Sequence, residues 1–155
     1  MHLYLIEHGE AGAEDLDPQR ALTDNGKSDI EKTAKFLEKI STETDEIWYS
    51  GKLRSKQTAE IIKKRVRYNS VKEKSFLNPN DPIGEAVKAL NRSDEDIIII
   101  GHLPFLQKLL SYLLTGEEKK ELVKFVNGSV LFLELGQFGW QMEWLVSPSI
   151  IKDDK

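Results

Sequence analysis

Two stretches decide the fold of this chain: Leu3-Tyr4-Leu5-Ile6-Glu7-His8-Gly9-Glu10 and Ile97-Ile98-Ile99-Ile100-Gly101-His102. Each contains a short apolar run of strand-forming residues that ends beside a histidine and a glycine. The second run is apolar on both faces, which is typical of a central parallel strand covered by helices. Ligands bind at the carboxyl ends of the strands in such a sheet. The two histidines therefore stand where a functional site is expected.

The composition is that of a globular protein. Of 155 residues, 39% are hydrophobic and 31% are charged, and this length suits one core, so we expect a single domain over residues 1–155. The formal net charge of −4 gives no long-range attraction to nucleic acid or to anionic lipid. The basic run Lys63-Lys64-Arg65-Val66-Arg67 is brief and has no interleaved stacking residues. We therefore expect neither a nucleic-acid nor a membrane partner.

Cysteine is absent from the sequence. This excludes disulfides, thiolate metal sites and a cysteine nucleophile. The N-terminus lacks the basic start and apolar segment of a secretory signal, and no apolar run approaches the ~20 residues that span a bilayer. We expect a cytoplasmic protein, and the size of the chain favours a monomer.

Short strands alternate with helices along the chain. Strands are predicted at His2–Ile6, Glu46–Ser50, Ser70–Phe76 and Asp96–Ile100. Helices are predicted at 25–40, after Ser50-Gly51 (with Ala59, Ile61, Ile62 and Val66), and at Ile83–Leu90, Leu103–Leu114 and Lys119–Phe125. The segments Ser129–Leu135 and Trp140–Val146 predict a terminal hairpin. The order predicts an α/β fold, a three-layer α/β/α sandwich with a mainly parallel central sheet and a late antiparallel strand.

Three polar side chains follow strands of this sheet within a few residues: His8, Arg54 and His102. If the strands are parallel neighbours, all three emerge at the same edge. A neutral imidazole is a competent nucleophile toward phosphorus, especially when a backbone carbonyl fixes its second nitrogen. Gly9 allows a close approach of the backbone, and a guanidinium at a helix start suits phosphate oxygens. His102 would add a second donor.

Each of these residues also has a purely structural interpretation. A lone histidine at a strand end is more often a hydrogen-bonded structural residue than a nucleophile. Arg54 alone would be a surface charge, and Arg20 a loop residue in a solvated ion pair. The third histidine, His2, begins its strand at the opposite edge, and the sequence has no ligand spacing, so we expect no metal site.

Four motifs occur in a fixed order along the chain. They are Glu7-His8-Gly9-Glu10-Ala11, Arg20-Ala21-Leu22-Thr23-Asp24-Asn25-Gly26, Ser50-Gly51-Lys52-Leu53-Arg54-Ser55-Lys56-Gln57-Thr58-Ala59-Glu60, and Gly101-His102-Leu103-Pro104. The order resembles that of the histidine phosphatase superfamily, and specifically its small branch typified by the phosphohistidine phosphatase SixA. The resemblance covers almost the whole chain and implies a phosphoglycerate mutase-like fold.

The resemblance also implies a reaction and a site. His8 would accept the phosphoryl group as a transient phosphohistidine, which water then hydrolyses, while Arg54, Arg20 and His102 hold the phosphoryl oxygens. Gly9 would lie at the substrate, and no metal or other cofactor would take part. The substrate would be a protein that carries phosphohistidine, such as a phosphorelay domain. Asp81 lies in the region where an acid could be supplied, although solvation of the loop is its ordinary role.

Glu7 departs from the family pattern, because it stands where the family has an arginine. A carboxylate about 5 Å from a phosphate dianion is repelled by several kcal/mol at an effective dielectric constant of about 20. Three arrangements would relieve the repulsion. Glu7 could rotate out of the pocket, pair with Arg20 or Arg54, or become protonated and act as the missing acid at the substrate.

Two other functions stay open. One is a phosphatase of a small phosphorylated substrate, a phosphoester. The other is a pseudo-phosphatase that binds a phosphorylated or anionic partner without turnover, because of Glu7.

Overall fold

A computed structural model describes residues 1–153 of the chain. Within these residues, six strands form one sheet in the order β3-β2-β4-β1-β5-β6. Their bounds are β1 His2–Glu7, β2 Glu46–Tyr49, β3 Ser70–Glu73, β4 Ile97–Gly101, β5 Val130–Gly136 and β6 Gly139–Val146. The strands β3, β2, β4 and β1 are parallel, whereas β5 pairs antiparallel with both β1 and β6. The predicted parallel sheet and late antiparallel hairpin are confirmed.

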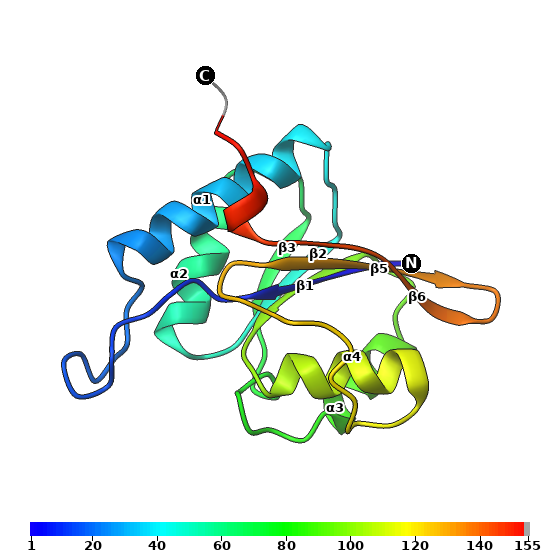
Figure 1. Cartoon of the computed structure of the whole chain (residues 1–155). Coiled ribbons are helices and arrows are strands. Elements are labelled where there is room, and N and C mark those ends of the chain that lie inside the picture. The colour runs from blue at the N-terminus through cyan, green and yellow to red at the C-terminus, as the bar shows by residue number, and fades with distance from the viewer. Residues whose placement is uncertain (154–155) are drawn as a thin grey trace.

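Helices cover both faces of the sheet (Figure 1). On one face lie α1 (Asp24–Lys39) and α2 (Leu53–Ile62), and on the other lie α3 (Gly84–Asn91) and α4 (Phe105–Thr115). A short 3₁₀ helix, η1 (Pro148–Ile150), follows the hairpin. The three-layer α/β/α sandwich is therefore confirmed. None of the helices in residues 1–153 is long and apolar enough to cross a membrane.

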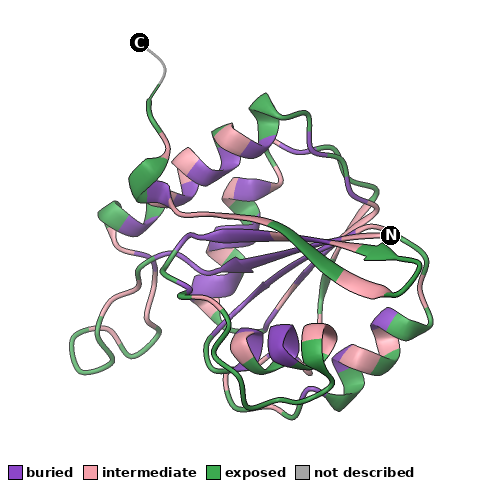
Figure 2. Cartoon of the chain, turned by 45° about the vertical axis from the view of Figure 1, so that its right-hand side comes forward, coloured by how far each residue is buried: buried purple, intermediate pink, exposed green. Residues whose placement is uncertain are grey.

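The central strands are buried on both faces, as Figure 2 shows. In β1, Leu3 and Leu5 pack into the core under α3 and α4, whereas Tyr4 and Ile6 pack under α1 and α2. This follows from the alternation of side chains along a strand. The apolar runs of the sequence are thus the two-sided strands that they predict.

The strand register sets which strand ends lie together. Glu7, the last residue of β1, pairs with Gly101, the last residue of β4. Tyr49, the last residue of β2, pairs with Ile100. The residues that follow these three strands therefore leave the sheet at one edge.

The loop after β1 is held against the start of α1. Thr23 caps this helix by accepting a hydrogen bond from the Gly26 amide at 2.9 Å. A Cβ atom at Gly26 would lie 2.1 Å from the Glu10 carbonyl oxygen, and one at Gly9 would lie 2.9 Å from the Gly26 oxygen. Both glycines are needed because two backbone segments approach closely here.

The helix predicted at Lys119–Phe125 is wrong. The chain between α4 and β5 is irregular, with no helix from residue 117 to residue 128. Its backbone bonds instead to side chains of α4, since Ser111 Oγ accepts from the Lys120 amide at 3.0 Å and Gln107 donates to the Val123 carbonyl at 3.2 Å. A helix of seven residues is marginal without tertiary support. These hydrogen bonds favour an extended path.

Two element boundaries also differ from the prediction. Val66 lies beyond the end of α2, in the turn before β3, although it is still buried against the same core. The strand β3 ends at Glu73 and does not reach Phe76. Both differences arise because apolar residues in turns also pack against the core, which a periodic pattern does not distinguish.

Candidate active site

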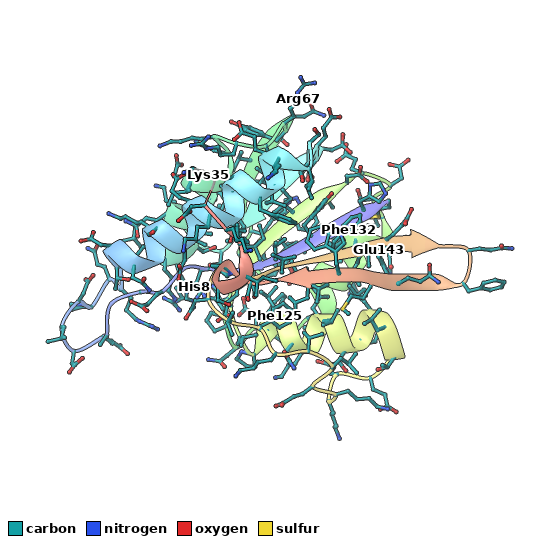
Figure 3. All side chains as sticks on the ribbon, turned by 45° about the horizontal axis from the view of Figure 1, so that its top comes forward. His8, Lys35, Arg67, Phe125, Phe132 and Glu143 are labelled. Carbon is teal, nitrogen blue, oxygen red and sulfur yellow. The ribbon has the colours of Figure 1, made fainter. Side chains whose placement is uncertain are left out.

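The structure brings together four of the residues predicted for the site. The ring centroids of His8 and His102 are 4.9 Å apart. Arg54 and Arg20 lie close enough for their positive charges to lower the pKa of both imidazoles. Figure 3 shows His8 at the end of the sheet opposite the tip of the β5–β6 hairpin. The predicted convergence at the carboxyl ends of the parallel strands is thus present.

The His8 ring has a defined tautomer. Its Nδ1 lies 2.7 Å from the Gly9 carbonyl oxygen, and since a carbonyl only accepts, Nδ1 carries the proton and Nε2 keeps its lone pair. Burial is the main cause that lowers the pKa of His8 to about 4, and the charges of Arg54 and Arg20 add to it. At neutral pH the ring is therefore uncharged, with one free lone pair on Nε2.

The backbone of the His8 segment is tied to two neighbouring elements. The His8 amide donates to the Gly101 carbonyl at 3.0 Å, and the Gly9 amide donates to Thr58 Oγ1 at 3.1 Å. Thr58 in turn donates to the Arg54 carbonyl at 2.8 Å. Thr58 thus fixes the His8 segment to α2, the helix that carries Arg54.

The resemblance implies that Gly9 lies at the substrate, and the structure shows its close approach to α1. A Cβ at this position would lie 2.9 Å from the Gly26 oxygen and 2.9 Å from Ile30. Its amide hydrogen is already used by Thr58. The observed role of Gly9 is to let the loop pack on α1.

Ser50 determines which nitrogen of His102 carries the proton. Ser50 Oγ lies 2.6 Å from His102 Nε2, and the same oxygen accepts from the Lys52 amide at 3.4 Å. Ser50 is buried, and the described residues offer its hydroxyl hydrogen no acceptor other than Nε2, so Nδ1 of His102 is the protonated nitrogen. This Nδ1 is buried and has no partner in the structure, which makes it a free donor.

His102 is also neutral. The pKa of this ring is lowered to about 3, mainly by burial and then by the neighbouring His8, Arg54, Lys52 and Arg20. A neutral ring that presents Nδ1–H can donate a hydrogen bond to an anion.

Arg54 and Arg20 supply positive charge at the site, and the charge of Glu14 acts on Arg54 without forming an ion pair with it. Neither guanidinium forms an ion pair with another described residue, and Arg54 Nε is buried without a partner. Burial and the charge of Arg20 lower the pKa of Arg54. Arg20 is held by a hydrogen bond from its Nε to the Gly12 carbonyl at 3.0 Å. A buried cation, Arg54, and a half-buried one, Arg20, beside two neutral imidazoles form a site suited to an oxyanion.

Glu7 neither leaves the protein interior nor pairs with an arginine. The residue is only 8% exposed. It forms no ion pair with Arg20 or Arg54, or with any other described residue. One carboxyl oxygen, Oε1, accepts from Asn127 Nδ2 at 3.4 Å, and the other, Oε2, is buried without a partner. Burial raises the pKa of Glu7 to about 7. Of the three arrangements predicted for Glu7, protonation is the one that this geometry favours.

Asp81 lies apart from these residues. Its Oδ2 accepts from the Asn78 amide at 2.9 Å within a loop turn. It lines a hollow of about 300 Å³ that is formed by the segment before α3 and by α3 itself. None of the residues described above lines this hollow, so the structure does not bring Asp81 to the site. Within residues 1–153 there is also no group of three or more histidine, aspartate or glutamate side chains that could hold a metal ion.

Three residues of the site received no role in the sequence analysis: Ser50, Thr58 and Asn127. Ser50 stands four residues before Arg54 and Thr58 four residues after it in the same motif, so this spacing could have indicated a role. Asn127 donates to Glu7 and, at 3.1 Å, to the His8 carbonyl. It lies 119 residues from His8 in an irregular segment, and no pattern in the sequence signals it.

Comparison with known proteins confirms the resemblance. In a search of family models no match was found. The protein histidine phosphatase SixA, solved with tungstate, superposes with a TM-score of 0.85 and 24% identity over 98% of this chain and 100% of its own. The alpha-ribazole phosphatase from Shigella flexneri superposes with a TM-score of 0.76 and 16% identity over 99% of this chain and 100% of its own. The chain therefore has the fold of the SixA-type histidine phosphatases.

A segment of the chain is also similar in sequence to curated proteins. The mitochondrial serine/threonine-protein phosphatase Pgam5 of Drosophila mojavensis is 33% identical over 85 residues, which are 53% of this chain and 29% of that protein. The chain thus matches less than a third of the length of these curated relatives. These three similar proteins are phosphatases by name.

Proposed function

We propose that this chain is a phosphatase that hydrolyses phosphohistidine on a protein, with a covalent phosphohistidine at His8 as the intermediate. One observation carries the proposal. His8 is a buried, neutral imidazole with Nδ1–H bonded to Gly9 and a free Nε2 lone pair, beside two guanidinium groups that form no ion pair with another described residue. This is the arrangement that a nucleophile toward a phosphoryl group requires.

The reaction has two steps. In the first, the lone pair of His8 Nε2 attacks phosphorus, the bond from phosphorus to the substrate nitrogen breaks, and that nitrogen keeps the electron pair and takes a proton from solvent. In the second, water attacks phosphorus and loses a proton to solvent, and the bond to Nε2 breaks, so that His8 regains its lone pair and inorganic phosphate is released. Arg54, Arg20 and the Nδ1–H of His102 stabilise the negative charge on the phosphoryl oxygens.

The choice of a protein substrate is supported by the comparisons. The SixA neighbour is named as a protein histidine phosphatase, and Pgam5 is named as a protein phosphatase. An imidazole is a better leaving group than an alkoxide, so a substrate of this class makes a small demand on a general acid. That demand fits a site from which Asp81 is remote. Metal independence, a single domain, a monomeric state and a cytoplasmic location belong to the same proposal.

A small phosphoester is the second candidate substrate, and the alpha-ribazole phosphatase neighbour favours it. A pseudo-phosphatase is the third candidate function, favoured by the glutamate at position 7. The experiment that separates them is phosphate release, in the presence of a chelator, from a phosphohistidine protein and from an aryl phosphate. The proposal predicts faster release from the phosphohistidine protein, faster release from the aryl phosphate would support the second candidate, and no release from either would support the third.

A further inference from the structure

Glu7 is fixed in place by the elements around it. Its amide donates to the Ser129 carbonyl at 3.2 Å, and its carbonyl accepts from the Gly128 amide at 3.0 Å. On the other side it pairs with Gly101 of β4. The backbone therefore cannot swing this side chain away from the edge of the sheet where His8 and His102 lie.

The two oxygens of the Glu7 carboxyl group have different surroundings. Asn127 Nδ2 donates to Oε1 and also to the His8 carbonyl, so Oε1 faces the segment before β5. Oε2 lies on the other side of the group, buried and without any hydrogen-bond donor. A negative charge on this oxygen would be buried and unpaired, which is costly. A proton on Oε2 removes the charge and converts the oxygen into a donor.

Three buried atoms without partners belong to residues at this edge of the sheet. Arg54 Nε and His102 Nδ1 are buried donors with nothing to bind, and Glu7 Oε2 becomes a third donor when it is protonated. A tetrahedral oxyanion offers acceptor oxygens to all three. An ionised Glu7 would instead repel the anion by several kcal/mol.

We propose that Glu7 binds the phosphoryl group as a neutral carboxylic acid, with Oε2–H donating to a phosphoryl oxygen and Asn127 orienting the group through Oε1. This inference rests on the proposed function, because it concerns the same site. Glu7 then provides an uncharged ligand at the position where the family has a cationic arginine. Anion binding becomes coupled to the uptake of one proton.

The two imidazoles beside Glu7 do not change their charge near neutral pH in the free protein. The pKa values of His8 and His102 are lowered to about 4 and about 3. The other charged groups on the elements around Glu7 are Arg54 and Lys52 at the start of α2, Arg20 in the loop after β1, and Lys124 in the segment that carries Asn127. Burial raises the pKa of Glu7 alone into this range, to about 7.

The test is the binding of tungstate as a function of pH, measured by calorimetry with dilute tungstate, which keeps its two negative charges over this range. Only the protonated form of Glu7 admits the anion, so the dissociation constant should rise about tenfold between about pH 6 and pH 8. In the Glu7→Gln variant, whose neutral side chain has the same shape, the dissociation constant should stay constant over this range. The matched control is Glu73→Gln, an exposed glutamate at the end of β3 on the same edge, which should keep the wild-type dependence.

The outcomes distinguish this inference from the proposed function. A wild-type dissociation constant that does not change with pH, or a Glu7→Gln variant that keeps the dependence, overturns the role of Glu7 even if the protein hydrolyses phosphohistidine. Coupled binding without hydrolysis supports the role of Glu7 and refutes the phosphatase. No tungstate binding at about pH 6 refutes both.

Discussion

Replacement of Gly26 by alanine tests how the sequence holds the loop that follows His8. The new Cβ atom would lie 2.1 Å from the Glu10 carbonyl oxygen and 2.9 Å from the Glu10 nitrogen. Both are backbone atoms, so no side-chain rotation relieves the clash. Either the first turn of α1 or the backbone of Glu10 must move by about 1 Å to restore an ordinary contact.

The expected cost is about 2 kcal/mol, since overpacking of this kind costs about 1 to 3 kcal/mol. For a chain of this length such a loss lowers Tm by about 4 to 8 °C. Glu10 lies two residues after His8, and the displacement reaches the Gly9 amide that bonds to Thr58. We therefore also expect tungstate affinity to fall by at least about tenfold, which corresponds to a loss of about 1.4 kcal/mol in binding free energy.

Urea unfolding and calorimetry measure both effects. The matched control is Gly84→Ala at the start of α3, where an added Cβ meets nothing within 4 Å. This variant should be neutral or more stable by about 0.5 to 1 kcal/mol. If Gly26→Ala unfolds and binds as the wild type does, the close approach of these backbone segments does not position the site, and the reasoning is refuted.

Three further predictions concern the hydrogen bonds and the charge at the site. In the folded protein burial raises the pKa of Glu7 to about 7, whereas in the unfolded chain this carboxyl group loses its proton above about pH 4.5. The free energy of unfolding of the wild type therefore falls between about pH 4.5 and pH 7. Glu7→Gln should therefore be more stable than wild type by up to about 3 kcal/mol at about pH 8 and by almost nothing at about pH 4.5, and urea unfolding that gives equal differences at both pH values contradicts this. Thr58→Val leaves the Gly9 amide without an acceptor and should cost about 1 to 3 kcal/mol in the same assay, whereas Thr58→Ser should lose little; similar losses in both variants would rule out the hydrogen bond as the cause. Ser50→Ala releases the His102 ring from its tautomer and should slow phosphate release about tenfold without loss of the fold, and an unchanged rate would show that Ser50 does not position the ring.

The sheet was predictable because the apolar pattern reports burial directly. A strand that is apolar on both faces, such as β4, has few possible places in a chain of this length other than the centre of a sheet covered by helices. The helix predicted at Lys119–Phe125 failed for the converse reason. Its polar composition permits a helix, but the hydrogen bonds that decide its path go to Ser111 and Gln107 of α4, which the local pattern does not contain.

The convergence of His8, Arg54 and His102 was predictable from topology alone, since parallel neighbours place their following residues at one edge. The state of Glu7 was not. Its burial, the lack of a partner for Oε2 and the contact with Asn127 depend on a segment 120 residues away. The sequence shows only that a carboxylate follows the strand, and the fold determines whether it is paired, solvated or protonated.

The most direct test of the phosphatase account is detection of the covalent intermediate. Wild-type protein is mixed briefly with a phosphohistidine protein, quenched in alkali, which preserves phosphohistidine, and analysed by mass spectrometry. The account predicts a phosphoryl group on His8, together with phosphate release that His8→Ala abolishes while it remains folded. Phosphate release that persists in His8→Ala, or turnover by the wild type with no phosphoryl group on His8, would contradict it.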